Sequence, residues 1–115
     1  MLKHVITDQC WLVQTQDYTA AEHLFDDSYA YFSSVSQSWL DHARRYTDMI
    51  ADRLELTASS RVVEIASNDG YLLRNFLSRG IPCLGVEPTS STAAAARELG
   101  IPVVEKFFGV ELAHE

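Results

Sequence analysis

The second half of the chain alternates short apolar runs with amphipathic segments. Residues 61–65 read RVVEI and residues 83–86 read CLGV, and such short, mostly apolar runs are typical of buried parallel strands. Between them, residues 71–79 place three leucines and a phenylalanine on one helical face. Gly80 ends that helix and Pro82 prevents its restart. The pattern predicts a strand–helix–strand crossover unit.

The same alternation continues after Pro88. The segment AAAARELG is a strong helix former that stops at Gly100, and the preceding SST offers N-cap oxygens. Residues 101–105, IPVVE, are predicted to form a third strand, since proline is tolerated where a strand starts. Residues 110–115 have the pattern of a first helical turn. The chain therefore predicts an α/β fold with parallel strands.

The first half of the chain is dominated by one long amphipathic helix. Ser36 is placed to cap it, and we expect it to run to about residue 54. Its predicted buried stripe follows helical spacing and contains Trp39, Ala43, Tyr46, Ile50 and Leu54.

Shorter elements are expected upstream of this helix. The pattern predicts a strand at 10–14, a helical turn at 19–25 and a polar, aromatic loop at 26–34. We therefore expect two units. These are an N-terminal segment with the long helix at 1–58 and a Rossmann-like half-domain at 59–115.

Charge and cysteine content limit the partners and the compartment. Sixteen acidic against nine basic residues give a net charge of −7, which argues against nucleic acid or an anionic membrane as the main partner. An apolar run of membrane-spanning length is absent from the sequence. Cys10 and Cys83 lie far apart, so a disulfide framework is not expected and a reducing cytoplasm is the default location.

The candidate chemistry lies at the carboxyl ends of the first two predicted strands, where ligands of crossover units bind. Glu64 opens the segment EIASNDG, and Glu87 ends the next strand 23 residues later. A dinucleotide-binding turn reads G-x-G-x-x-G, but its glycine positions here are Ala66, Asn68 and Tyr71. A pyrophosphate needs the close backbone approach that those glycines allow, so NAD is disfavoured.

S-adenosylmethionine (SAM) carries no phosphate and uses a looser turn, E-x-G-x-G-x-G. The segment from Glu64 to Gly70 keeps this frame, with Ala66 and Asn68 replacing two glycines. A carboxylate at Glu87 could accept both ribose hydroxyls. The alternative is a strand–helix turn that binds nothing, because many such turns need a glycine and a glutamate after a strand is common. Spacing alone leaves both interpretations open.

The stretch from VVEIASNDGYLLRNF through GVEP to VEKFFGVELA resembles the cofactor-binding half of sugar C-methyltransferases. The upstream segments CWLVQ and LFDDSYAYFSSVSQSWLDHARRY also match. These enzymes use SAM to methylate a carbon of nucleotide-linked keto-deoxysugars. The resemblance implies a partial Rossmann-like sheet with strand order 3-2-1. It also implies a set of cofactor-binding residues, Glu64, Ala66, Ser67, Asn68, Asp69, Gly70, Glu87 and Pro88.

The family chemistry is proton abstraction beside a ketone, followed by attack of the carbanion on the methyl group. The resemblance places the YAYFSS loop toward the sugar, which makes Tyr29 and Tyr31 the catalytic candidates. A phenol can donate a hydrogen bond to the ketone oxygen as enolate charge develops. The alternative is that both tyrosines belong to the core beside the aromatic helix.

Two departures from the family pattern matter. Family members begin with a zinc module of two cysteine pairs, but here Thr7 stands where the partner of Cys10 would be and the first pair is absent. One thiol cannot supply the four ligands of structural zinc, so we expect no metal. The chain also stops at Glu115, inside the methyltransferase domain of the family. We therefore expect weak cofactor binding and little activity from the chain alone.

The same departure exposes an edge of the sheet. The first strand, at 61–65, would lack one neighbour, and such an edge invites pairing. We expect the N-terminal strand or the long helix to cover it, or a homo-oligomer or the missing C-terminal half to pair there. The functional alternative is a non-catalytic binding or assembly module that retains the methyltransferase fold.

Overall fold

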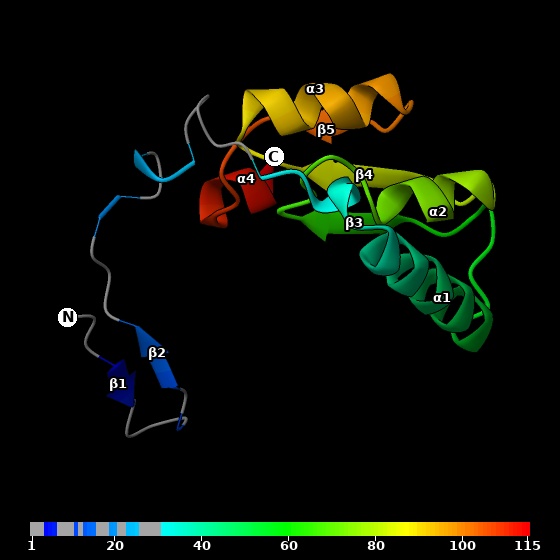
Figure 1. Cartoon of the computed structure of the whole chain (residues 1–115), viewed down its shortest axis with the longest axis horizontal. Coiled ribbons are helices and arrows are strands. Elements are labelled where there is room, and N and C mark those ends of the chain that lie inside the picture. The colour runs from blue at the N-terminus through cyan, green and yellow to red at the C-terminus, as the bar shows by residue number, and fades with distance from the viewer. Residues whose placement is uncertain (1–3, 7–10, 12, 16–18, 21–22, 26–30) are drawn as a thin grey trace.

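A computed structural model describes residues 4–6, 11, 13–15, 19–20, 23–25 and 31–115 (Figure 1). The strands are β1 (His4–Ile6), β2 (Val13–Thr15), β3 (Val62–Ile65), β4 (Cys83–Val86) and β5 (Val103–Val104). The helices are the 3₁₀-helix η2 (Ser33–Val35) and the α-helices α1 (Gln37–Arg53), α2 (Leu73–Ser78), α3 (Ser90–Glu98) and α4 (Val110–His114).

The three strands of the second half form one parallel sheet in the order β3-β4-β5. In β3 and β4 the register runs from Val62 opposite Cys83 to Ile65 opposite Val86. β4 then pairs with β5 through Val86 and Val104. This confirms the predicted α/β fold and its 3-2-1 strand order. The carboxyl ends of β3 and β4 therefore lie side by side.

The core fills the space between the sheet and its helices. Leu73 and Phe76 of α2 are almost fully buried, and both belong to the predicted apolar face of that helix. They pack with a set of apolar residues from all the neighbouring elements: Ala51, Ile81, Cys83, Ala96 and Ile101. Ala51 belongs to α1, so the long helix contributes to the same core as the half-domain. The division at residue 58 stays a prediction.

Helices α2 and α3 end in the same hydrogen-bonded cap. After α2, Gly80 has a φ of +72° and its N–H donates to Leu77 O, while Ile81 N–H donates to Phe76 O. Gly100, with a φ of +81°, repeats this arrangement after α3. This is the Schellman motif, whose apolar residue after the glycine packs back on the helix. The cap thereby turns the chain into the following strand.

The N-terminal caps of the two longest helices differ from each other. Ser36 Oγ accepts from Trp39 N at the start of α1, which confirms that predicted cap. The expectation of a cap from the SST segment is wrong. Thr89 precedes the first turn of α3 and makes no side-chain cap, while Ser90 Oγ donates to Glu105 instead.

The predicted buried stripe of α1 is only partly correct. Ala43, Thr47 and Ala51 are buried, whereas Trp39, Tyr46 and Leu54 of the expected stripe are exposed. The reason is that α1 packs on α2, and small side chains spaced by four allow the two helices to approach closely. The large aromatic side chains consequently lie beside the contact rather than in it.

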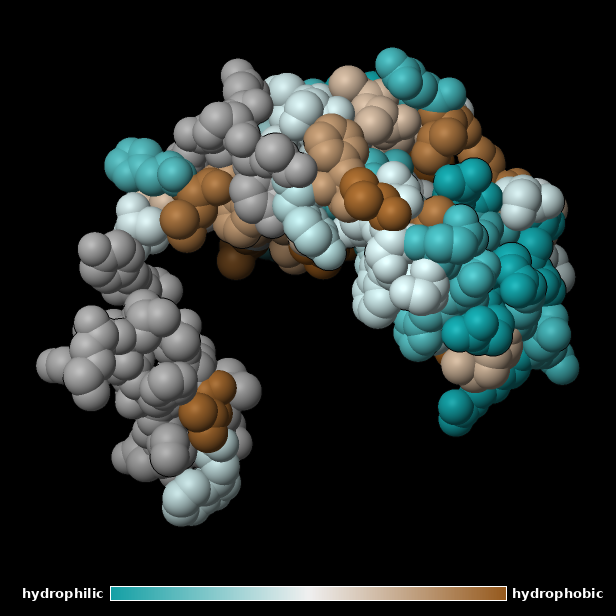
Figure 2. Space-filling model, viewed as in Figure 1, coloured by the Kyte–Doolittle hydropathy of each residue, from teal (hydrophilic) through white to brown (hydrophobic). Residues whose placement is uncertain are grey.

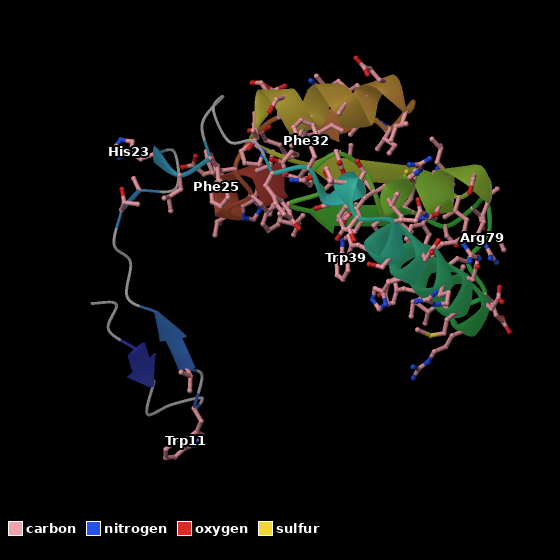
Figure 3. All side chains as sticks on the ribbon, viewed as in Figure 1. Trp11, His23, Phe25, Phe32, Trp39 and Arg79 are labelled. Carbon is pink, nitrogen blue, oxygen red and sulfur yellow. The ribbon has the colours of Figure 1, made fainter. Side chains whose placement is uncertain are left out.

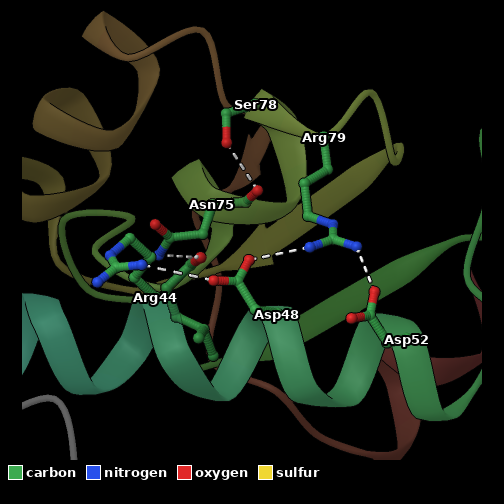
Figure 4. A network of polar contacts seen from close by, with 7 residues as sticks. Arg44, Asp48, Asp52, Asn75, Ser78 and Arg79 are labelled. Carbon is green, nitrogen blue, oxygen red and sulfur yellow. Dashed lines mark hydrogen bonds and ion pairs between the residues drawn. The ribbon is translucent and has the colours of Figure 1, made fainter.

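A charged network joins the outer surfaces of α1 and α2 (Figure 4). Arg79 donates to Asp48 at 2.9 Å and to Asp52 at 2.6 Å, and Arg44 lies 3.6 Å from Asp48. These groups are solvent-accessible, so each pair contributes at most about 1 kcal/mol. In Figure 2 the hydrophilic surface gathers over this part of the molecule.

The N-terminal region contains a two-stranded antiparallel sheet, in which Val5 of β1 lies opposite Gln14 of β2. The predicted strand at 10–14 overlaps β2, and β1 was not predicted. β1 and β2 pair with each other and not with β3, so the expectation that the described N-terminal strands cover β3 is wrong. Cys10, Tyr29 and most of the loop at 26–34 lie outside the described residues. The end of that loop forms η2.

Candidate functional site

A cavity of about 390 Å³ lies at the carboxyl ends of the parallel strands. Its wall is built from segments that are far apart in sequence. The lining residues are Phe25, Tyr31, Ser33, Ile65, Ala66, Asn68, Tyr71, Val86, Glu87, Pro88, Lys106, Phe107 and Phe108. In Figure 3, Phe25 lies beside α4, on the side toward which β3 points. The cavity is where the crossover geometry predicts a ligand.

The turn after β3 has the backbone of a glycine-rich loop. Ala66 has a φ of +59°, Asn68 of +50° and Gly70 of +78°. These are the three positions at which the E-x-G-x-G-x-G frame carries glycine. The left-handed region costs an L-residue roughly 1–2 kcal/mol, and asparagine tolerates it best. The turn therefore keeps the glycine geometry although two of the glycines are replaced.

Glu87 is held against this turn by backbone amides. One carboxylate oxygen, Oε2, accepts from Asn68 N at 2.9 Å, and Oε1 accepts from Thr89 N at 3.0 Å. The side chain is 5% exposed and lines the cavity. A carboxylate has about four lone-pair positions, so each oxygen can accept a further hydrogen bond. The two amides fix the orientation of a negative charge at the cavity wall.

Asn68 and Asp69 use their side chains to hold the aromatic segment before α1. Asn68 Oδ1 accepts from Ser33 N at 2.9 Å, and Asn68 Nδ2 donates to Tyr31 O at 3.0 Å. Asp69 Oδ2 accepts from Ser34 N at 2.9 Å. The turn at the end of β3 thereby binds a segment some 35 residues earlier in the chain. This contact brings Tyr31 and Ser33 to the cavity.

Glu64 lies in a different environment from Glu87. Burial, with a smaller contribution from the neighbouring Asp69, raises the pKa of Glu64 from 4.5 to about 7. Within the described residues, Glu64 Oε2 and Asp69 Oδ1 are buried and have no hydrogen-bond partner. Burial and the nearby Glu64 also raise the pKa of Tyr71. Glu64 is therefore protonated over much of the acidic range, and its side chain is absent from the cavity wall.

The raised pKa of Glu64 predicts a pH-dependent stability. A carboxyl group whose pKa is higher in the folded state makes its full contribution to stability at a pH below its pKa in the unfolded state, near 4.5. This contribution is lost as pH rises through the pKa of the folded state, about 7. The rise from 4.5 to about 7 corresponds to roughly 3 kcal/mol. We expect Glu64→Gln to remove this loss, because glutamine does not ionise. The unfolding free energy of the variant should therefore rise by that amount relative to the wild type between pH 4.5 and pH 8. Urea unfolding at several pH values measures it.

Glu98→Gln is the matched control, because Glu98 is exposed on α3. Its unfolding free energy is expected to follow the wild type at every pH. Parallel pH profiles for Glu64→Gln and the wild type would contradict the buried, protonated state of Glu64.

The structure brings together five of the ten residues proposed from the sequence. Tyr31, Ala66, Asn68, Glu87 and Pro88 line the cavity. Glu64, Ser67, Asp69 and Gly70 are not among the lining residues, and Tyr29 is outside the described residues. The expectation that Glu64 lies at the methionine end of the cofactor stays a prediction. Its carboxylate lies near Asp69 and Tyr71.

Several lining residues were not proposed from the sequence. Tyr71 follows the SNDG turn directly, and Phe107 and Phe108 follow β5. All three lie at carboxyl ends of parallel strands or in the turn after them, so the rule that pointed to Glu87 could also have indicated these aromatic residues. Trp39 of α1 lies beside Tyr71, with ring centroids 5.9 Å apart.

Over the described residues, His, Cys, Asp and Glu side chains do not gather in groups of three or more that could hold a metal ion. In the same part of the chain, the helices are too short or too polar to cross a bilayer.

The parallel sheet, the turn with three left-handed positions and the fixed carboxylate after β4 define a Rossmann-like α/β protein. A family model that matches the chain was not found. The chain is 31% identical over 111 residues to the C-methyltransferase NovU of Streptomyces niveus, covering 96% of this chain and 26% of that protein. The chain thus resembles a C-methyltransferase along nearly its whole length, and it spans about a quarter of the length of that relative.

Two of the solved structures that resemble part of the chain are methyltransferases. The glycopeptide N-methyltransferase MtfA complexed with (S)-adenosyl-L-methionine is 23% identical, with a TM-score of 0.47, over 74% of this chain and 38% of that chain. A SAM-dependent methyltransferase from Archaeoglobus fulgidus is 18% identical, with a TM-score of 0.41, over 62% of this chain and 35% of that chain.

Proposed function

We propose that this chain forms the cofactor-binding part of a SAM-dependent C-methyltransferase that acts on nucleotide-linked keto-deoxysugars in the cytoplasm. The observation that carries the proposal is the buried carboxylate of Glu87, fixed by two amides at the cavity wall. The similarity to a C-methyltransferase along nearly the whole chain supports the reaction class.

The residues present fit SAM. The cavity has a volume within the usual range for small-ligand pockets, and its wall is mostly apolar and aromatic with few polar groups. Glu87 would accept the ribose hydroxyls, and Pro88 with the aromatic residues would contact the adenine. The turn at Ala66 and Asn68 would face the rest of the ligand. When bound, SAM supplies an electrophilic methyl group on a sulfonium.

Tyr31 is the described candidate for contact with the sugar. It lines the cavity through a segment that is hydrogen-bonded to the cofactor turn. In this role its phenol would donate to the ketone oxygen and stabilise charge that develops there. Tyr29 is proposed for the same surface on the basis of the family resemblance.

Nuclear magnetic resonance titration tests the cofactor proposal, because it detects weak binding. We expect S-adenosylhomocysteine, the demethylated product, to shift the amides of Asn68, Val86 and Glu87 with a dissociation constant near or below about 1 mM. NAD is expected to leave these amides unchanged, since the turn lacks the glycines that a pyrophosphate needs. Shifts with NAD alone, or with neither ligand, would contradict the proposal.

The activity of the chain alone is expected to be weak or absent, because the chain corresponds to only about a quarter of the C-methyltransferase that it resembles. The alternative, a non-catalytic binding or assembly module, is favoured by one observation. β3 stands at the edge of its sheet, and its side chains Val63 and Ile65 are 58% and 52% exposed. An exposed apolar edge strand is a surface for pairing with another strand.

This edge predicts association, either between two copies of the chain or with a further segment of a methyltransferase domain. We expect the chain to form concentration-dependent oligomers, and Val63→Lys to shift them toward the monomer because it places a charge in the contact. Sedimentation velocity over a wide concentration range measures both proteins. Val110→Lys is the matched control, since Val110 is also exposed but lies in α4. A wild type that stays monomeric at high concentration, with rapid amide exchange in β3, would contradict association.

A further inference from the structure

Asn68 occupies a position where the glycine-rich frame requires only a left-handed backbone. Its φ of +50° would suit glycine, yet its side chain is almost fully buried, with 9% of the residue exposed. Both polar atoms of that side chain are hydrogen-bonded to the backbone at Tyr31 and Ser33. The amide therefore does something that a glycine in the same turn cannot do.

The same residue also contacts the carboxylate of the cavity. Asn68 N–H donates to Glu87 Oε2 at 2.9 Å, while its side chain contacts the aromatic segment. A continuous path of hydrogen bonds thus runs from Glu87 through Asn68 to Tyr31 and Ser33. Asp69 adds a second contact, to Ser34 N. The turn after β3 therefore joins the side of the cavity that holds Glu87 to the side formed by the segment 31–34.

We propose that Asn68 is a positioning residue, which holds the segment 31–34 on the cavity and couples its docking to occupation of the site at Glu87. The proposal rests on the proposed function for the identity of the ligand. A ligand that binds between Glu87 and the segment 31–34 needs that segment in place. The apparent affinity for the ligand therefore falls in proportion to the fraction of molecules in which the segment is docked. This docking holds the backbone of Tyr31 at the cavity.

The Asn68→Gly variant separates the contribution of the side chain from that of the backbone. Glycine adopts a positive φ without strain, so the turn and its N–H to Glu87 are kept while both side-chain hydrogen bonds are lost. Ala66→Gly is the matched control. It changes the other non-glycine left-handed position of the same turn and removes only a methyl group.

Amide hydrogen exchange reads the contact directly, because Ser33 N–H and Ser34 N–H are the donors. In Asn68→Gly without ligand, we expect exchange at Ser33 to rise about tenfold or more. Exchange at Ala66, whose N–H donates to Val86 O, is expected to stay unchanged, which separates local undocking from unfolding. Ala66→Gly is expected to leave Ser33 as in the wild type. Equal exchange at Ser33 in all three proteins would overturn the positioning role.

The same measurements with ligand present test the coupling between docking of the segment 31–34 and binding at Glu87. S-adenosylhomocysteine is expected to slow exchange at Ser33 and Ser34 of the wild type and to bind Asn68→Gly about tenfold more weakly. If the ligand shifts Glu87 but leaves Ser33 and Ser34 unprotected, the coupling is wrong and the proposed function stands. If the ligand shifts no amide at all, the proposed function and the coupling both fail, and the ligand-free comparison alone decides the positioning role.

Discussion

Glu87→Gln is expected to weaken the binding of S-adenosylhomocysteine by about tenfold to a hundredfold. A hydrogen bond to a charged group contributes about 1.5–3 kcal/mol, and glutamine retains only one acceptor oxygen at a wall where two amides already donate. The amide NH₂ would also face either Asn68 N–H or Thr89 N–H, donor against donor. Titration followed by nuclear magnetic resonance, on wild type and variant, measures the loss.

The control must separate binding from folding, because Glu87 is buried. The unfolding free energy of Glu87→Gln is expected to fall by about 1–3 kcal/mol, so binding is compared at a temperature where both proteins are folded. Glu98→Gln removes a carboxylate from the exposed face of α3 and is expected to bind as the wild type does. Unchanged affinity in a folded Glu87→Gln would show that this carboxylate does not hold the ligand.

Gly70→Ala is expected to destabilise the fold by about 2–4 kcal/mol, from strain and overpacking together. Gly70 has a φ of +78°, and a Cβ there would lie 2.5 Å from Ile101 Cδ1 and 3.2 Å from Ala96 Cβ. Ile101 is 1% exposed and Ala96 is fully buried, so neither can move without repacking of the core. Urea unfolding measures the change.

Gly80→Ala separates the two contributions to this loss. Gly80 has nearly the same φ, +72°, but a Cβ there meets no atom within 4 Å. We expect it to cost only the backbone strain, about 1 kcal/mol. The difference between the two variants is then the packing term at Gly70. Equal losses would mean that the turn does not pack against α3 as described.

The sheet and its turn could be predicted from the sequence because local signals agreed with one another. The apolar runs at 61–65 and 83–86 and the glycines after the two helices each favour the same crossover unit. The Schellman glycines lie where the helices were expected to end. The ends of parallel strands indicated Glu87, and its side chain does face the turn.

The contacts between distant segments could not be predicted in the same way. The stripe of α1 was assigned by helical spacing and correctly included Ala43. Packing on α2 buries Thr47 and Ala51 as well, and only this tertiary contact selects those two small residues. Asn68 was interpreted as a substitute for glycine at a turn. Its side chain binds backbone groups 35 and 37 residues away, and backbone partners leave no pattern in the sequence. Phe107 and Phe108 differ from Asn68 in this respect, because they follow β5 and the strand-end rule could have indicated them.

A crystal structure of the chain soaked with S-adenosylhomocysteine tests the central claim most directly. The claim is that the cavity beside the SNDG turn takes the nucleoside, with its sugar held by the carboxylate after β4. We predict both ribose hydroxyls within hydrogen-bond distance of the Glu87 carboxylate, with the amides of Asn68 and Thr89 still donating to it. Density for the nucleoside elsewhere, or a ribose turned away from Glu87 inside the cavity, would contradict the account.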